Sequence, residues 1–337
     1  MKLDAALPPV ALKQVPNIAA AAEQVGFAGL WTQETQHDPF LPCALIAQHT
    51  SRIQLGTGIA VAFGRSPATL AYTAWDLAEQ SGGRFMLGLG TQVKAHIERR
   101  FGMEWPDSVS GKLREQILAV RAFWNAWQNG AALNFRGRYY KITLMSPFFN
   151  PGPIAHPHIP IYIAGVNTRL AHLAGELCQG FHVHPLHTRK YLHEVLVPAI
   201  EAGAQENGRT LRDVEIVLTA FAATSPQERE QCRQQISFYA STPSYRAVLE
   251  LHGWAGVAEQ LSALAARGRW QEMPALVTDE MLDEFCTWGN GPAQLARALR
   301  ERYDGLAGRL AIYSPFIPGG RDDFWCDLVS GFASQPA

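Results

Sequence analysis

The chain alternates short apolar runs with longer segments in which apolar residues recur at helical spacing. Eight of the short runs have the length and composition of buried strands: 2–7, 27–32, 53–59, 85–90, 161–164, 180–184, 214–222 and 309–313. Helical patterns follow them, the first at 12–25, 41–50, 68–80 and 92–100. Connections of a few residues favour parallel strands joined by right-handed crossovers. This order predicts the α/β class and, with eight strands, a (β/α)8 TIM barrel.

Two segments are longer than a barrel connection requires. Residues 91–158 contain a long helical pattern at 111–128, a hairpin at 133–142 and a Pro-rich loop, and residues 226–304 are mostly helical. We interpret both as insertions, after strands four and seven, in a single domain spanning 1–337. The remaining helices are predicted at 168–177, at 190–207 and after Arg321. A doubly wound sheet is the alternative, but neither Gly56-Thr57-Gly58 nor Gly88-Leu89-Gly90 continues into G-x-G-x-x-G.

Composition narrows the functional classes. The 337 residues are 47% hydrophobic, and 29 basic residues balance 30 acidic ones, so nothing predicts binding to nucleic acid or to a membrane surface. The five cysteines are scattered and form no C-x-x-C pair, and no apolar run reaches the roughly 18 residues of a membrane span. We expect a cytoplasmic protein that acts on a small molecule.

In a barrel, functional residues lie at the carboxyl ends of the strands. The second strand is followed by a polar stretch that is either a wall with an acid/base candidate or a capping loop: Glu34, Thr35, His37 and Asp38. The third strand ends at Gly58-Ile59 and its loop carries Arg65, before a helix that Ser66 caps and Pro67 begins. The fourth strand leads to Gly90, Thr91 and, on a short polar helix, His96.

The fifth strand gives the clearest chemical signal. It ends in Gly165-Val166-Asn167-Thr168-Arg169, where a cap-type residue opens a helix. The start of a helix offers unpaired backbone N–H groups and partial positive charge, which suits a phosphate. Arg169 in the first turn opposes the helix dipole, and its presence there suggests an anion nearby. An ordinary capped helix is the alternative interpretation.

The sixth strand ends in His182-Val183-His184. Alternate residues of a strand share a face, so both histidines are expected to point to the same side. Two such histidines could form part of a metal site, but no second H-x-H and no carboxylate-rich strand end accompanies them. We therefore favour pocket-lining histidines and predict no metal.

Five stretches in order resemble the bacterial luciferase-like superfamily of flavin and deazaflavin oxidoreductases. They are AAEQVGFAGLWTQET (21–35), IQLGTGIAVAFGRSPATLA (53–71), GGRFMLGLGTQ (82–92), FRGRYY (135–140) and IPIYIAGVNTRLAHLAGELCQGFHVHP (159–185). Within that superfamily the chain is most similar to oxidoreductases that use coenzyme F-420, an 8-hydroxy-5-deazaflavin. The likeness covers most of the first 185 residues, and the C-terminal part matches only loosely.

The resemblance implies a barrel that holds the cofactor ring at the strand ends and transfers a hydride between deazaflavin C5 and a small organic substrate. It implies a cis peptide at Gly58-Ile59, facing the ring, and a cofactor phosphate on residues 165–169. The implied cofactor-binding residues are Thr35, Gly58, Ile59, Arg65, Gly90, Thr91, His96, Gly165, Val166, Asn167, Thr168, Arg169 and His182. It also implies a homodimer.

The chain departs from the sugar-phosphate and alcohol dehydrogenases of that subgroup at two positions. Thr35 follows Glu34 where those relatives carry a catalytic His, and Val93 stands where they carry a Glu. The acid/base role therefore falls to Glu34, His37 or His184. Three alternatives remain: an FMN-dependent monooxygenase using O2, a metal-dependent barrel hydrolase built on the two histidines, and a catalytically silent flavin-binding protein.

Overall fold

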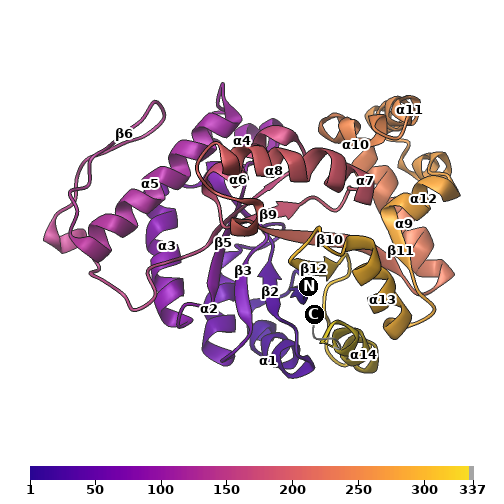
Figure 1. Cartoon of the computed structure of the whole chain (residues 1–337), viewed down its shortest axis with the longest axis horizontal. Coiled ribbons are helices and arrows are strands. Elements are labelled where there is room, and N and C mark those ends of the chain that lie inside the picture. The colour runs from indigo at the N-terminus through magenta and orange to yellow at the C-terminus, as the bar shows by residue number, and fades with distance from the viewer. Residues whose placement is uncertain (334–337) are drawn as a thin grey trace.

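The computed structural model describes residues 1–333, and in them eight parallel strands close into a barrel (Figure 1). The order around the barrel is β1-β2-β3-β5-β8-β9-β10-β12, closed by the pairing of β12 with β1. The predicted TIM barrel is therefore confirmed. The strands are β1 Lys2–Ala6, β2 Gly29–Thr32, β3 Gln54–Thr57, β5 Phe85–Gly90, β8 Ile161–Gly165, β9 Gly180–Val183, β10 Glu215–Ala223 and β12 Arg309–Ile312.

Helices surround the barrel with their apolar faces against it. In α1 the buried residues recur at helical spacing (Val15, Ile18, Ala19, Ala22), and the helix ends at Gly26 with φ 95°, a conformation that glycine adopts without a steric penalty. The surrounding helices are α1 Val15–Val25, α2 Phe40–His49, α3 Pro67–Gln80, α6 Thr168–Leu177, α8 Val197–Gln205, α13 Pro292–Tyr303 and α14 Asp322–Ala333. The side chain of Ser66 accepts from Thr69 N–H, which confirms the predicted cap of α3.

The predicted continuous helix at 190–207 is wrong in one respect. It divides into α7 Arg189–Tyr191, a π-helical segment Leu192–Leu196 and α8. Pro198 lies in the first turn of α8. Because proline has no backbone N–H, the regular hydrogen-bond ladder cannot pass through it, and the wider π turn lies directly before it.

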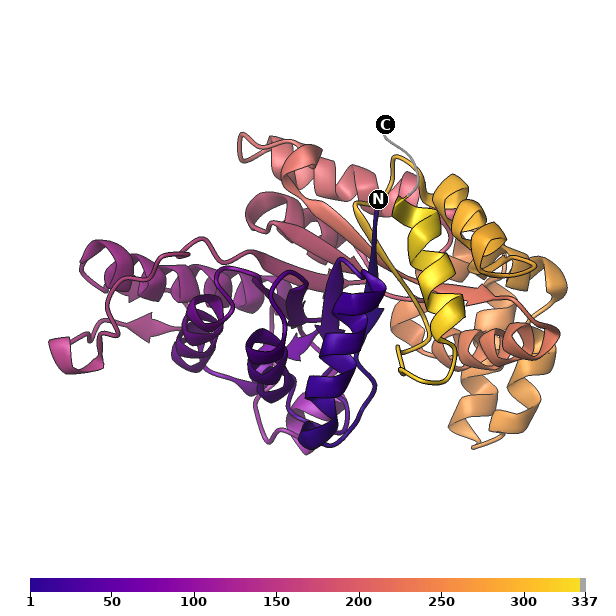
Figure 2. The same cartoon turned by 90° about the horizontal axis from the view of Figure 1, so that it is seen from below.

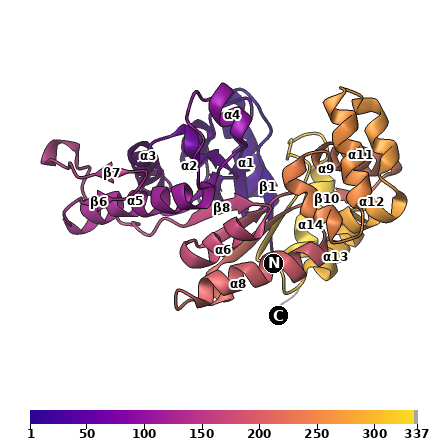
Figure 3. The ribbon, with the colours of Figure 1, turned by 90° about the horizontal axis from the view of Figure 1, so that it is seen from above.

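The first insertion contains α4 Lys94–Arg99, α5 Val109–Asn129 and a hairpin of β6 Phe135–Arg136 and β7 Lys141–Ile142. The hairpin projects beyond α5, away from the barrel (Figure 1). The second insertion forms a helical lobe on the other side of the barrel (Figure 3). Its elements are α9 Pro226–Ala240, α10 Arg246–Glu250, α11 Ala255–Ala266, α12 Asp279–Phe285 and β11 Cys286–Trp288.

Strand β11 was not predicted. It pairs in parallel with the end of β10, at Phe221↔Cys286 and Ala223↔Trp288, so β10 runs on past the barrel into the second insertion. Figure 2 shows β10 reaching across toward this lobe. A strand of three residues directly after a helix is too short to produce a recognisable alternation.

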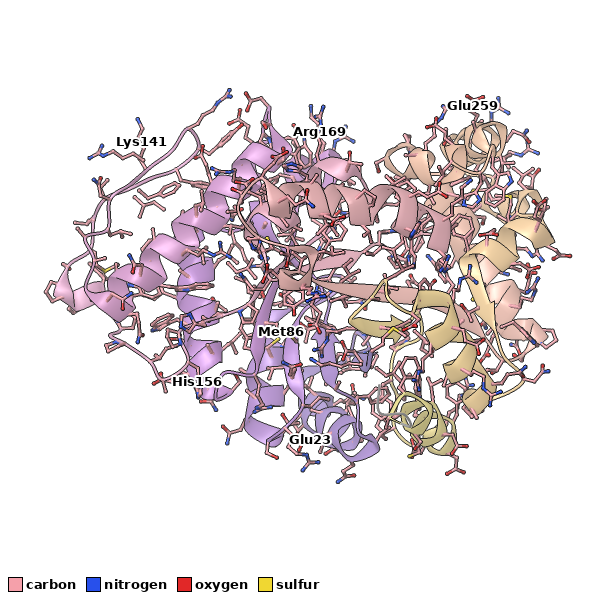
Figure 4. All side chains as sticks on the ribbon, in the orientation of Figure 1. Glu23, Met86, Lys141, His156, Arg169 and Glu259 are labelled. Atoms are coloured by element: carbon pink, nitrogen blue, oxygen red, sulfur yellow. The ribbon has the colours of Figure 1, made fainter. Side chains whose placement is uncertain are left out.

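The strand register gives the barrel interior a layered filling. At one end the Asp4 carboxylate accepts hydrogen bonds of 2.7 and 2.8 Å from Arg309 and one of 2.8 Å from Trp31 Nε1. Above this pair Trp31, Met86, Tyr162 and Val217 form a small buried cluster. Figure 4 shows the labelled Met86 among the strands. The packed interior leaves the carboxyl ends of the strands as the place for a ligand.

Candidate functional site at the mouth of the barrel

The end of β3 has the backbone that the resemblance implied. The Gly58-Ile59 peptide is cis, and Gly58 N–H donates to Thr32 O at 2.7 Å. The chain continues into β4 Ala60–Val61, which pairs with the end of β5. A Cβ on Gly90 would lie 2.5 Å from Ile59 Cδ1. Glycine at position 90 therefore allows the Ile59 side chain to pack directly against β5.

His182 lies beneath this peptide. Its ring meets the edge of Trp31 with centroids 4.6 Å apart, and its Cε1 is 3.6 Å from where a Cβ on Gly58 would stand. Its Nε2 is buried and has no hydrogen-bond partner within residues 1–333. Burial, with a smaller contribution from Arg309, lowers the pKa of His182 to about 3, so the ring is neutral at physiological pH. The ring contacts Trp31 and Tyr162 of the interior cluster.

Glu34 and Arg65 hold each other. Glu34 Oε2 accepts from Arg65 Nη1 at 2.6 Å and from the backbone N–H of Val61 at 2.6 Å, while Asp38 Oδ2 accepts from Arg65 Nη2 at 2.9 Å. Gln116 donates from Nε2 to the carbonyls of Ala62 and Arg65. The ion pair thus joins the loop after β2 to the loop after β3. The Glu34 carboxylate is thus already engaged by a guanidinium and a backbone N–H.

Four other predicted residues lie around the rim of the mouth. Thr35 and His37 are exposed and line a small cavity together with Leu7, Pro8 and Pro42. Thr91 is buried, and His96 is exposed on α4. Arg100 joins α4 to the loop after β2 by donating to Thr35 O at 3.2 Å. The structure therefore places His37 and His96 in solvent, where each could meet a bound ligand only from the rim.

The start of α6 opens onto a groove. Asn167 precedes the helix without a side-chain cap hydrogen bond, so the first backbone N–H groups of α6 are available to a ligand. The groove has a volume of about 440 Å³ and runs between α5, α6 and α8. Its lining is Ser108, Ser110, Gly111, Arg114, Thr168, Arg169, His172, Leu173, Glu176 and Ala199.

Charge in this groove is partly compensated. Arg114 Nε donates to Glu176 at 2.6 Å, and His172 Nε2 lies 3.1 Å from a Glu206 carboxylate oxygen. Arg169 is exposed, and Figure 4 shows it at the surface. The preceding loop is tied down because Tyr191 donates to Val166 O at 2.9 Å. These features suit an extended anionic group lying along α6.

His184 follows β9 and is enclosed by aromatic rings. Its ring centroid is 4.3 Å from Tyr245 and 4.7 Å from Tyr239. Its Nδ1 accepts from the backbone N–H of Leu186 at 3.1 Å, and burial, followed by His187, lowers its pKa to about 3. The proton of the neutral ring therefore resides on Nε2, and His184 can donate a hydrogen bond but is a poor base.

The two histidines do not complete a metal site. Within the described part of the chain, no group of three or more His, Cys, Asp and Glu side chains could hold a metal ion. The hydrolase alternative thus lacks a third ligand. None of the helices in residues 1–333 is long and apolar enough to cross a membrane.

Several residues at the mouth and in the groove were missed by sequence reasoning. Ser108, Ser110, Arg114 and His172 line the groove, although the sequence marks them only as polar positions on or just before helices. Tyr239 and Tyr313 come together from an insertion and from the end of β12, with hydroxyls 2.6 Å apart. No local sequence pattern connects Tyr239 with Tyr313. The alternation of inward and outward side chains along β12 could have indicated only that Tyr313 lies on the inward face.

Comparisons with known proteins agree with this fold. Residues 3–309 match the family of luciferase-like monooxygenases. An uncharacterised protein of Mycobacterium tuberculosis is 42% identical over 316 residues, covering 92% of each chain. The 5,10-methylenetetrahydromethanopterin reductase of Methanolobus tindarius is 28% identical, covering 90% of this chain and 91% of the relative. The solved coenzyme F420-dependent tetrahydromethanopterin reductase of Methanopyrus kandleri superposes with a TM-score of 0.78 at 22% identity, over 98% and 97% of the two chains.

Proposed function

Because the chain belongs to the luciferase-like monooxygenase family, we propose that it is an oxidoreductase transferring a hydride between a deazaflavin coenzyme, F420, and a small organic substrate. Relatives named as F420-dependent enzymes support this proposal, among them a glucose-6-phosphate dehydrogenase of Amycolatopsis mediterranei that is 25% identical over 70% of its length. The reaction requires a cofactor pocket at the strand ends and one proton exchanged with the substrate.

The groove at the start of α6 is the feature that favours F420 over FMN as the cofactor. The cofactor phosphate binds at residues 165–169, where backbone N–H groups are open and Arg169 adds positive charge. The groove continues beyond this point to Arg114 and His172. A deazaflavin carries an acidic tail beyond its phosphate, whereas FMN ends there, so the room in the groove past the phosphate favours the deazaflavin.

The ring of the cofactor lies against the cis peptide side of the mouth. Gly58, Ile59, Gly90 and Thr91 form its backing, and neutral His182 lies beneath. The remaining predicted contacts are at the rim: Thr35, Arg65 and His96. When bound, the deazaflavin supplies a carbon that accepts or gives a hydride.

The proposed acid/base residues now have different roles. Glu34 orients Arg65 and the loop after β3, because its carboxylate is already held. His184 carries its proton on Nε2, because Nδ1 accepts from the backbone N–H of Leu186, and in this proposal it donates that hydrogen to the substrate. His37, exposed on the loop after β2, is the remaining candidate for the acid/base role.

Assembly and location form a second part of the proposal. We propose a cytoplasmic homodimer whose subunit is one domain spanning 1–337. A relative that matches 92% of its own length supports the single domain. The apolar side chains of Leu144 and Phe148, 79% and 89% exposed on the first insertion, support burial against a second copy. Light scattering on the purified protein measures its molar mass and so tests the proposed dimer. A monomer mass at micromolar concentration would contradict the proposal.

Titration of the purified protein with F420 and with FMN tests the cofactor. We expect F420 to bind at least about 10-fold more tightly, because only F420 occupies the groove beyond the phosphate. Quenching of the cofactor fluorescence reports each dissociation constant. Tighter binding of FMN would favour the flavin-dependent monooxygenase instead. If the protein binds neither cofactor, the proposed function is wrong although the fold is that of the family.

A further inference from the structure

The mouth of the barrel has an aromatic wall opposite the cis peptide. The wall consists of His184, Phe221, Tyr239, Tyr245 and Tyr313. In the closed order of strands, β10 lies across the barrel from β3, so Phe221 on β10 stands opposite the end of β3. A ligand in the mouth therefore has the Gly58-Ile59 peptide on one side and this wall on the other.

The alternation of side chains along β10 and β12 indicates that two members of the wall, Phe221 and Tyr313, face the barrel interior and its mouth. On β12 the side chain of Arg309 points inward to Asp4, so Tyr313, four residues further, is on the same inward face. On β10, Val217 belongs to the interior cluster, and Phe221 shares its parity. Tyr239 packs on both, with ring centroids 6.5 Å from Phe221 and 6.0 Å from Tyr313.

The two tyrosine hydroxyls form one hydrogen bond and leave one hydrogen free. Tyr239 and Tyr313 have their oxygens 2.6 Å apart. Burial raises the pKa of both, so both carry a proton at neutral pH. Two O–H groups sharing one bond have a second hydrogen to donate elsewhere. Tyr313 is 38% exposed whereas Tyr239 is partly buried, so the Tyr313 side chain is the more accessible of the two to a ligand.

The wall carries no formal charge. The His184 ring is neutral, since its pKa is about 3, and the other members are a phenylalanine and protonated tyrosines. Aromatic faces favour flat apolar groups, and a neutral hydroxyl favours a neutral acceptor. An anionic substrate would lose its hydration here without gaining a positive partner.

We propose that the aromatic wall is the substrate subsite and that Tyr313 donates a hydrogen bond to the carbonyl oxygen of an uncharged aromatic ketone or aldehyde. Tyr239 orients the Tyr313 hydroxyl and is a positioning residue. The inference rests on the proposed function in taking such a carbonyl compound as the hydride acceptor, but the binding of the compound can be measured without the cofactor.

Acetophenone and ethylbenzene test this subsite, because they share a ring and a two-carbon chain and differ in the carbonyl oxygen. Wild-type protein should bind acetophenone about 5- to 10-fold more tightly than ethylbenzene, the preference expected from one neutral hydrogen bond. In Tyr313→Phe this preference should disappear while ethylbenzene binds unchanged. Equilibrium dialysis gives the four dissociation constants.

Tyr72→Phe is the matched control, because it makes the same replacement on α3, outside the aromatic wall. It removes a hydroxyl that donates to Phe149 O at 2.6 Å. It should keep the wild-type preference. The proposal is overturned if wild-type protein shows no preference, if Tyr313→Phe retains it, or if Tyr313→Phe weakens both ligands equally. F420 titration separates the two proposals: protein that prefers acetophenone but binds no F420 keeps the subsite and loses the proposed cofactor.

Discussion

Arg65 and Glu34 form a hydrogen-bonded ion pair of 2.6 Å in which the two side chains are only 15% and 7% exposed. The pair joins two loops 31 positions apart in sequence. Removal of one member of a buried pair leaves the other charged and unpaired, which typically costs several kcal/mol.

Replacing Arg65 by methionine should therefore destabilise the protein by about 3 kcal/mol. The expected result is a lower urea midpoint with an unchanged m-value. Arg246→Ala is the control, since Arg246 pairs with Glu250 and Glu259 at the surface, where solvent screens the charges, and its loss should leave the urea midpoint nearly unchanged. An Arg65→Met protein as stable as the control would show that the pair contributes little.

Three buried histidines should make the protein acid-sensitive. Burial lowers the pKa of His182 and His184 to about 3 and that of His187 to about 4, against an ordinary value near 6.5. Their contribution to stability is fully present above pH 6.5 and is lost as the pH falls below it, because the unfolded chain takes up protons first. Between pH 6.5 and 5.5 each should cost about 1 kcal/mol.

Urea unfolding at pH 6.5 and 5.5 measures this loss. His187→Asn should reduce the pH dependence by about one third, since it removes one of three similar groups. His193→Asn, a replacement on the π-helical segment, should leave the dependence unchanged because His193 is exposed. Equal slopes in all three proteins would argue against a burial effect at His187.

Arg169→Gln should weaken F420 binding about 5- to 10-fold at low salt, because it removes a charge beside the proposed phosphate site. The defect should shrink as salt is added, since the side chain is exposed and screened. Lys141→Gln removes the same charge on β7, and Figure 4 shows Lys141 on the projecting hairpin, so its affinity should match the wild type. Fluorescence titration measures both. Equal affinities of the two variants would place the phosphate elsewhere.

Gly175→Ala should destabilise the protein even though alanine is the better helix former. A Cβ at Gly175 would lie 2.0 Å from the carbonyl oxygen of Ile200 in α8, and the backbone there cannot yield as a flexible side chain could. The cost, at least about 2 kcal/mol, exceeds the roughly 1 kcal/mol gained in helix propensity. Gly256→Ala in α11 meets nothing within 4 Å and should stabilise by about 0.5 kcal/mol. Thermal unfolding of both variants tests the opposite signs.

The barrel could be predicted because each of its strands and helices is marked by a pattern within a short stretch of sequence. Each strand is an apolar run bounded by turn residues, and the boundaries of 85–90 and 168–177 agree with β5 and α6 to the residue. The cis Gly58-Ile59 peptide followed from the family resemblance and is confirmed. No alternation or spacing within the chain indicates such a bond.

The site residues could be predicted only in part, because their partners are distant in sequence. The sequence offered Glu34 and Arg65 as separate candidates, and only the fold shows them neutralising each other. Arg114 and Glu176 on the groove are 62 positions apart, and Tyr239 and Tyr313 are 74 apart. Contacts of this kind depend on how helices and loops pack, which no local periodicity records.

The pair of Asp4 and Arg309 joins residues 305 positions apart, on the two strands that close the barrel. At a synthesis rate of about 5–20 residues per second, roughly 15 to 60 s separate the synthesis of β1 from that of its neighbour β12. Through that interval one hydrogen-bonding edge of β1 and the Asp4 carboxylate lack their final partners. We expect ribosome-bound chains halted before residue 309 to be cut readily within β1 by added protease and longer chains to resist; equal resistance would show that β1 is protected before the barrel closes.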